Sequence, residues 1–130
     1  MNNIGLLLLR VSAGAMMLLH GIAKLIHGVG FIEGMLVSMG LPAFLAWGVY
    51  VGEVIAPLML IVGYRTKIGG AVMAFNCLVA MLMVHSSNLF ALGEHGGLAN
   101  ELLFLYFFAS LALLFTGGGK YAVSNKNKWD

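Results

Sequence analysis

Ionisable residues interrupt segments of this chain that are otherwise apolar. Arg10, His20 and Lys24 fall within the first apolar segment, and Glu53 lies near the middle of the second. A charged side chain near the centre of a bilayer costs at least ~2.5–3.5 kcal/mol, so such residues usually face a bundle interior and pair. The candidates for ligand binding or proton handling are therefore these four residues together with His85 and Glu101, at the ends of later segments.

Depth along the helices predicts which of these groups meet. At about 1.5 Å per residue, Glu53 lies roughly 6 Å in depth from both Arg10 and His20. We expect Glu53 to pair with Arg10, with His20 and Lys24 facing the same interior. Lys24 and Glu101 lie near the outer boundary, where a second pair is expected. For Arg10–Glu53, a purely structural ion pair is as consistent with the sequence as a functional one. For Lys24–Glu101, snorkelling of the charged side chains at the interface is favoured over catalysis.

The sequence offers little for metal or redox chemistry. His20, His85 and Glu101 lack a diagnostic ligand spacing, so we expect no metal site, and no catalytic residue is assigned. Cys77 is the single cysteine, so neither an internal disulfide nor a redox pair of thiols can form. Any redox role therefore needs a bound cofactor, such as a quinone, or a partner protein. Asn76 adds an amide that must find a hydrogen bond in the core.

Composition indicates that lipid surrounds most of the chain. Apolar residues make up 61% and charged residues 9%, against about 25% charged in soluble domains. Four apolar segments approach the roughly 20 residues that a membrane crossing needs, at about 4–26, 42–63, 67–85 and 98–116. We expect residues 1–130 to form one all-α membrane domain, a bundle of four transmembrane helices. The glycine-punctuated segment 28–40, between helices one and two, is too short to span and is expected to be interfacial or re-entrant.

Positive residues predict the orientation of this bundle. Arg65, Lys67 and three lysines of the polar segment 117–130 would share one side with both termini, while Lys24 lies toward the other. This asymmetry favours cytoplasmic termini. The polar segment is expected to be frayed. Small residues at Gly48 and Gly52 indicate close helix packing, either within the bundle or in a homodimer. The bilayer is the expected partner, and nothing in the charge pattern indicates nucleic acid.

Three motifs in order along the chain resemble those of DoxX-family membrane proteins. The first is Leu9-Arg-Val-Ser-Ala-Gly-Ala-Met-Met-Leu-Leu-His-Gly-Ile-Ala-Lys24. The second is Gly40-Leu-Pro-Ala-Phe-Leu-Ala46, leading into the helix of Glu53 and the ending Leu60-Ile-Val-Gly-Tyr-Arg65. The third is Gly96-Gly-Leu-Ala-Asn-Glu101, followed after an apolar helix by Thr116-Gly-Gly-Gly-Lys-Tyr121. The resemblance covers almost the whole chain, and one departure is Gly118, where many members read Gly-Pro-Gly.

The resemblance implies a four-helix membrane fold and an association with redox systems. The family takes its name from a subunit linked to thiosulfate:quinone oxidoreductase. Arg10, His20, Lys24, Glu53 and Glu101 match its recurring polar positions. We therefore expect a redox- or quinone-linked subunit of the bacterial inner membrane, with a soluble or membrane redox protein as partner. A small transporter or lipid-handling protein and a non-catalytic scaffold are the alternatives, and whether the chain is itself an enzyme stays open.

Overall fold

The computed structural model describes residues 2–84 and 101–130, and this part of the chain contains helices and no β-strand. The predicted all-α class is therefore confirmed. The longest helices are α1 (Asn2–His27), α5 (Thr66–Val84) and α6 (Glu101–Thr116), and a short helix, α2 (Gly30–Ser38), follows α1. A continuous helical run joins the 3-10 turn η1 (Ala43–Trp47), α3 (Gly48–Tyr50), the π-helix η2 (Val51–Ile55) and α4 (Ala56–Val62).

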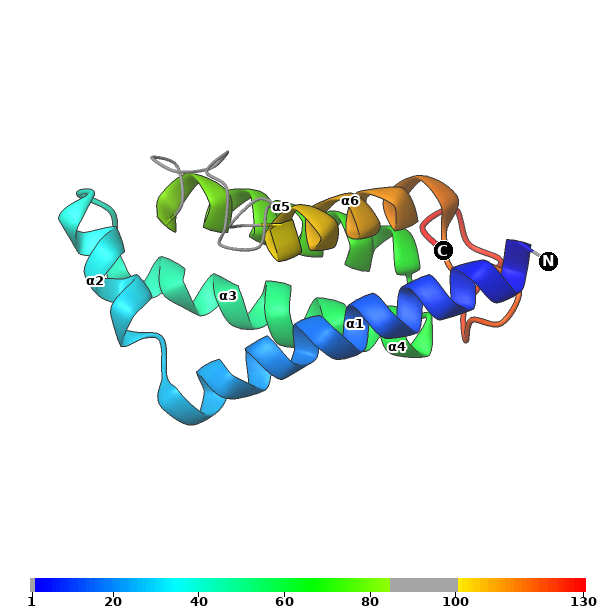
Figure 1. The fold of residues 1–130 in the computed structure, drawn as a ribbon, viewed down its shortest axis with the longest axis horizontal. Helices are drawn as coiled ribbons and strands as arrows, with labels where there is room; N and C mark the ends of the chain where they lie inside the picture. Colours follow the sequence, from blue (N-terminus) through cyan, green and yellow to red (C-terminus); the bar gives the residue numbers. More distant parts are fainter. Residues whose placement is uncertain (1, 85–100) are drawn as a thin grey trace.

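Two of these helical stretches are long and apolar enough to cross a membrane. They are Asn3–His27 and Ala43–Val62, whereas the apolar stretches Thr66–Leu82 and Leu102–Thr116 are shorter over the described residues. The structure thus supports two membrane spans by length, and four crossings remain a prediction. The segment 28–40 forms α2, which is steeply inclined to the other helices at one end of the molecule (Figure 1).

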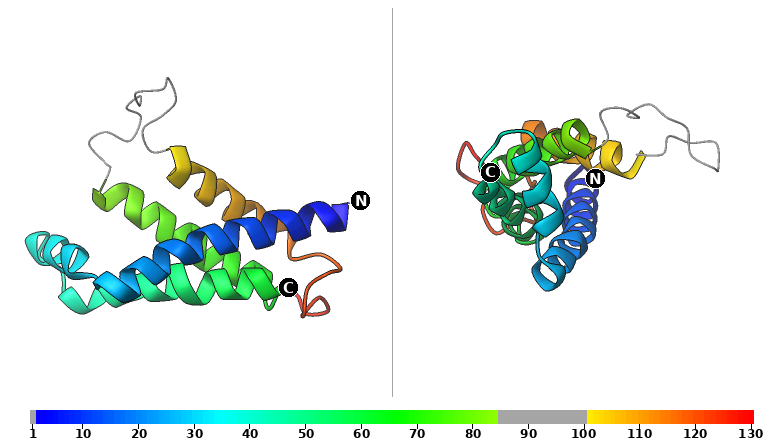
Figure 2. Two further views of the ribbon diagram at one scale, coloured as in Figure 1. Left: turned by 60° about the horizontal axis from the view of Figure 1, so that its bottom comes forward. Right: turned by 90° about the vertical axis from the view of Figure 1, so that its left-hand side faces the viewer.

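The long helices form two antiparallel pairs that pack on each other. α1 lies against α4, α5 lies against α6, and α4 joins the pairs by packing on α5 (Figures 1 and 2). Residues near both chain ends meet the turn between α4 and α5 at one end of this bundle. There the Lys120 amide donates to Oδ1 of Asn3 over 3.0 Å, and the Lys67 amide donates to the Trp129 carbonyl over 3.0 Å.

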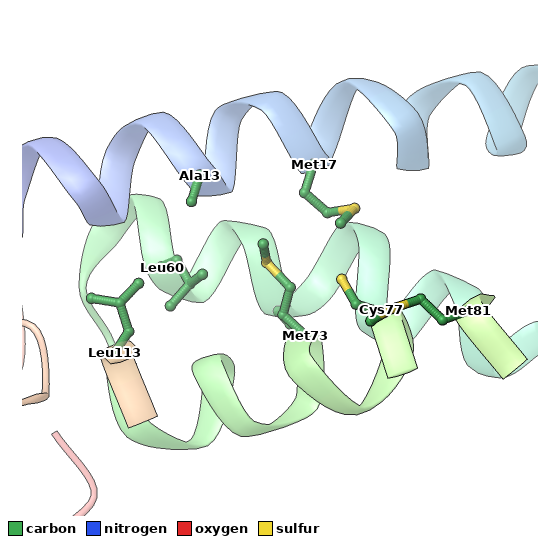
Figure 3. Packing of buried hydrophobic residues seen from close by; sticks show 8 residues of the cluster. Ala13, Met17, Leu60, Met73, Cys77, Met81 and Leu113 are labelled. Atoms are coloured by element: carbon green, nitrogen blue, oxygen red, sulfur yellow. The ribbon is translucent and has the colours of Figure 1, made fainter. Parts of the chain in front are cut away.

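Sulfur-containing side chains fill much of the core between the pairs. Met73, Cys77 and Met81 recur every fourth residue along α5 and are buried, so they share one helix face. Met17 of α1 meets this face from the opposite side (Figure 3). Unbranched thioether side chains adapt to irregular gaps, which suits the junction of four helices. Cys77 is thus part of the packed core.

Small residues set the closest helix contacts. A Cβ at Gly70 would lie 2.6 Å from the Ser110 carbonyl of α6, and one at Gly52 would overlap the Asn76 side chain of α5. Gly52 therefore packs within the bundle, as one of the two interpretations of the small-residue stripe predicts. Gly48 differs, because a Cβ there would meet nothing within 4 Å.

Candidate functional site

Glu53 occupies a π-helical turn that a proline explains. Pro57 has no amide hydrogen, so it cannot donate to the Glu53 carbonyl four residues earlier, and its ring crowds that carbonyl. The backbone widens instead, and the Ala56 amide donates to the Val51 carbonyl, five residues back. Such single π turns are rare and are often found at functional sites. The turn places the Glu53 side chain in the interior, where the residue is 5% exposed.

Gly21 lets α1 approach this widened turn. A Cβ at position 21 would overlap the Glu53 carbonyl oxygen, so only glycine fits at this contact. Gly14, two turns earlier on the same face, plays the same part against α4, because its Cβ would lie 2.9 Å from the Pro57 carbonyl. Lys24 follows Gly21 by three residues and so lies on nearly the same face. The close approach therefore carries Lys24 to Glu53.

Lys24, Glu53 and Asn76 form a cluster contributed by α1, η2 and α5. Nζ of Lys24 lies 2.7 Å from Oε1 and 2.6 Å from Oε2 of Glu53. Nδ2 of Asn76 donates to Oε2 over 3.2 Å. The Lys24 side chain is 33% exposed, while that of Glu53 is 6% exposed. The cluster therefore holds a buried carboxylate whose cationic partner still reaches the surface.

The predicted Arg10–Glu53 pair is wrong. Nη1 of Arg10 donates to the carbonyls of Leu60 and Ile61 over 3.0 and 2.9 Å, and Nη2 donates to the Tyr121 carbonyl over 2.7 Å. The last carbonyls of a helix lack intrahelical partners, and the buried guanidinium of Arg10 satisfies two of them at the end of α4. Leu60 lies seven residues after Glu53, roughly 10 Å along the helix, so Arg10 is out of register with the carboxylate.

The other predicted site residues are not part of this cluster. His20 is exposed and makes a T-shaped ring contact with Tyr106, with ring centroids 5.8 Å apart. The prediction that it shares the interior with Lys24 is therefore wrong, because Gly14, Gly21 and Lys24 define the face toward α4. The Lys24 ammonium, expected to pair with Glu101, binds Glu53 instead. His85 and the side chain of Glu101 lie outside the described residues.

An apolar groove adjoins the cluster through Asn76. It has a volume of about 660 Å³ and lies between α2, the helical run from Leu45 to Gly52, and α5. Its lining includes Leu36, Val49, Phe75 and Val79, and Asn76 is the only polar side chain among its described lining residues. Gly48 leaves space along one wall, because a Cβ there would meet nothing within 4 Å. The groove can therefore hold an apolar molecule and offer one amide to a polar group on it.

The sequence alone predicts Asn76 only as an amide in need of a partner. A readable signal for the site was present, since Pro57 follows Glu53 by four residues and a proline at that spacing disturbs the helix at the glutamate. The contribution of Asn76 could not be read in the same way. It depends on α5 packing against Gly52, a contact between separate helices.

Comparison with known proteins identifies the family. The family model named DoxX matches residues 5–86, which include the whole Lys24–Glu53–Asn76 cluster. A Haemophilus influenzae protein described as "Uncharacterized protein" is 31% identical over 121 residues, covering 91% of this chain and 87% of that protein. A Bacillus subtilis protein named "Putative oxidoreductase CatD" is 35% identical over 81 residues, covering 62% of this chain and 60% of that protein. No solved structure matches. The chain therefore belongs to the DoxX family of membrane proteins.

Proposed function

We propose that this protein is the membrane subunit of a quinone-linked redox system and binds quinone in the apolar groove. The observation that carries the proposal is the double role of Asn76. Its side chain lines the groove and also donates to the Glu53 carboxylate. A molecule in the groove would thus lie beside a buried charge pair, separated from it by a single amide.

The chemistry of a quinone suits these surroundings. Quinones join a polar ring to an apolar tail, and the groove offers apolar walls and one amide. Its volume of about 660 Å³ lies within the roughly 300–1,000 Å³ of small-molecule sites. Among the described contacts, one of the two N–H groups of Asn76 is used on Glu53. The second can donate to a ring oxygen.

Reduction of a quinone to a quinol takes two electrons and two protons. In this proposal Lys24 and Glu53 relay the protons, and the partly exposed ammonium in contact with both carboxylate oxygens supports that role. Cys77 is the single cysteine, so the chain has no redox pair of thiols to supply electrons. In this proposal the electrons come from a soluble or membrane redox partner. The word "oxidoreductase" in the name of the Bacillus subtilis relative supports such an association.

We further propose that four helices cross the bacterial inner membrane. α5 has 19 residues, or about 28 Å, which approaches the ~30 Å hydrocarbon thickness. The end of the bundle that carries both termini also holds Arg65, Lys67 and the lysines of 117–130. Positive residues favour the cytoplasmic side, so we assign this end to the cytoplasm. α2 would then lie at the opposite interface. Because Gly48 lines the groove, we assign its open face to the ligand and not to a second copy of the chain.

Lipid handling is the alternative that the same groove favours. An acyl chain needs only apolar walls, which all the described lining residues except Asn76 provide. The two functions differ in what the Lys24–Glu53–Asn76 cluster does. With a quinone in the groove, the cluster interacts with the polar ring. With an acyl chain in the groove, the cluster has no polar group to bind.

Filling the groove tests the proposal. Gly48→Leu adds a side chain into open space, and Gly5→Leu is the matched control because a Cβ there also meets nothing within 4 Å. Quinone and phospholipid are extracted from the mildly purified proteins and quantified by chromatography. The melting temperature is then followed as quinone is added.

We expect the parent protein and Gly5→Leu to retain quinone and to melt at higher temperature when quinone is added. Gly48→Leu should lose both effects while folding normally. Loss of bound phospholipid instead of quinone in Gly48→Leu would support lipid handling. Failure of the parent protein to bind added quinone would refute the proposed function.

A further inference from the structure

A polar hollow lies at the end of the bundle where residues near both chain ends meet. It has a volume of about 430 Å³ and is distinct from the apolar groove, with which it shares no lining residue. Its lining comes from the start of α1, the start of α5, the end of α6 and the segment 117–130. These elements lie together at one end of the bundle (Figure 2). Its described lining includes Asn3, Lys67, Thr116, Lys120, Asn127 and Asp130.

The uncompensated charge of this hollow is positive. Neither Lys67 nor Lys120 forms an ion pair within residues 2–84 and 101–130, where the two ion pairs involve Lys24 and Arg65. Asp130 carries the acidic side chain in the lining, and that side-chain carboxylate is already occupied. Oδ1 lies 3.1 Å from Nη1 of Arg65, and Oδ2 accepts the amides of Lys126 and Asn127 over 3.0 and 2.7 Å. The main-chain oxygen of Asp130 accepts the Gly118 amide over 2.8 Å. Two ammonium groups therefore remain for an anion.

Two asparagine side chains add oriented donors. The Lys120 amide donates to Oδ1 of Asn3, and the Trp129 amide donates to Oδ1 of Asn127, both over 3.0 Å. A backbone N–H can meet only the oxygen of a side-chain amide, so these contacts determine the orientation of both groups. Within the described contacts, the NH₂ groups of Asn3 and Asn127 are unused. The hollow therefore presents two ammonium groups and two amide donors.

We propose that this hollow binds a phosphate group. A phosphate carries negative charge and several acceptor oxygens, and so can engage more than one ammonium and amide donor at once. Two sources share this chemistry: the headgroup of an anionic phospholipid and a water-soluble phosphate. The helix ends surround the hollow, so a headgroup can enter it while its acyl chains lie along the exposed apolar side chains of α1 and α6, such as Leu8 and Phe115.

Binding to the purified full chain in detergent tests the site away from the surface potential of a bilayer. The probes are short-chain phosphatidylglycerol, short-chain phosphatidylcholine, glycerol 1-phosphate and inorganic phosphate, each followed by native mass spectrometry and thermal shift. Lys67→Gln/Lys120→Gln removes the two cations of the hollow. The matched control, Lys126→Gln/Lys128→Gln, removes the same charge from the same end of the bundle but outside the lining.

We expect phosphatidylglycerol to bind more tightly than phosphatidylcholine. Each lysine removed from the hollow should weaken binding about fivefold, or about 25-fold for the pair, since a lysine near an anionic surface contributes about this factor. The control pair should change binding less than about threefold. Asn3→Asp keeps an oxygen for the Lys120 amide but replaces the free donor with an anion, and should weaken binding by a comparable factor without loss of fold.

Competition decides the source of the phosphate. Tight binding of phosphatidylglycerol with weak binding of glycerol 1-phosphate assigns the hollow to a lipid headgroup, whereas equal binding assigns it to a soluble phosphate. Equal losses in the two lysine pairs would overturn the proposal, because the attraction would then be a property of the whole charged end. Equal affinity for phosphatidylglycerol and phosphatidylcholine, or no saturable binding of any probe, would overturn it as well.

Discussion

Energetic coupling between Lys24 and Glu53 is the sharpest test of the register of α1. A double-mutant cycle uses Lys24→Met, Glu53→Gln and their combination, with Arg10→Met in place of the lysine change as the matched cycle. Lys24 touches Glu53, whereas Arg10 binds carbonyls near the end of α4. The two cycles therefore compare a pair in contact with a pair that is out of register.

The expected size follows from geometry and exposure. At an effective dielectric constant of about 20, two unit charges ~4 Å apart attract by ~4 kcal/mol, and the contacts of Nζ to both carboxylate oxygens are 2.7 and 2.6 Å. Removal of one partner from a fully buried pair costs ~3–5 kcal/mol. The Lys24 side chain is 33% exposed, so screening by water and salt reduces this. We expect Lys24→Met to cost about 2–3 kcal/mol.

The measured quantity is the free energy of unfolding in bicelles for every member of both cycles. The Lys24–Glu53 coupling should be about 1–2 kcal/mol, within the range for residues in contact. Arg10→Met and Glu53→Gln should be additive within ~0.5 kcal/mol, because they share no partner. A Lys24–Glu53 coupling below that error, or a larger Arg10–Glu53 coupling, would refute the observed register.

Three contacts elsewhere make predictions of their own. Gly21→Ala should lower the free energy of unfolding by at least ~1–3 kcal/mol, because the added Cβ overlaps the backbone of η2. Gly5→Ala, where the Cβ enters open space, should raise the free energy of unfolding by up to ~1 kcal/mol. Both values are read from unfolding curves. Arg10→Lys should speed proteolysis within 117–130 about tenfold, because loss of the charge-assisted hydrogen bond to the Tyr121 carbonyl costs ~1.5 kcal/mol. An unchanged rate of cleavage would contradict this. Burial opposes ionisation of Asp130, but hydrogen bonds from Ser124, the Asn127 amide and Arg65 outweigh it and hold the pKa of Asp130 below its ordinary 3.8. Its stabilisation of the segment should therefore be complete above about pH 4 and lost only as pH falls through that lower value. The Asn127 amide shift should titrate with a midpoint below 3.8, and a higher midpoint would refute the contact.

Order in the segment 117–130 is the clearest case that composition could not predict. Its polar residues and glycines predict a frayed tail, yet the Val123 and Ser124 amides donate to the carbonyls of Val62 and Gly63, each over 3.1 Å. Arg10 binds the Tyr121 carbonyl in the same region. The end of α4 thus provides acceptors that the tail satisfies. Local composition carries no information about acceptors that another helix presents.

The predicted pairing failed for a related reason. Depth along regular helices puts Arg10 and Glu53 at similar heights, but the carbonyls at the end of α4 compete for Arg10. The helix around Glu53 is also not regular, because Pro57 converts it to a π turn. Lys24 reached Glu53 because Gly21 lets the two backbones approach closely. The carbonyl partners of Arg10 and the close approach at Gly21 are contacts between helices, which no spacing within one helix reports.

The sequence by itself determined the helical, apolar character of this protein and the need for partners. Apolar runs of helical length require a non-aqueous environment, and a charge within such a run is too costly to leave unpaired. Only the tertiary structure decided that Glu53 pairs with Lys24 and Asn76, while Arg10 holds backbone carbonyls. The physical reason is register: the fit of glycines against neighbouring backbones determines how one helix is positioned along another, and this position selects the partner of every buried charge.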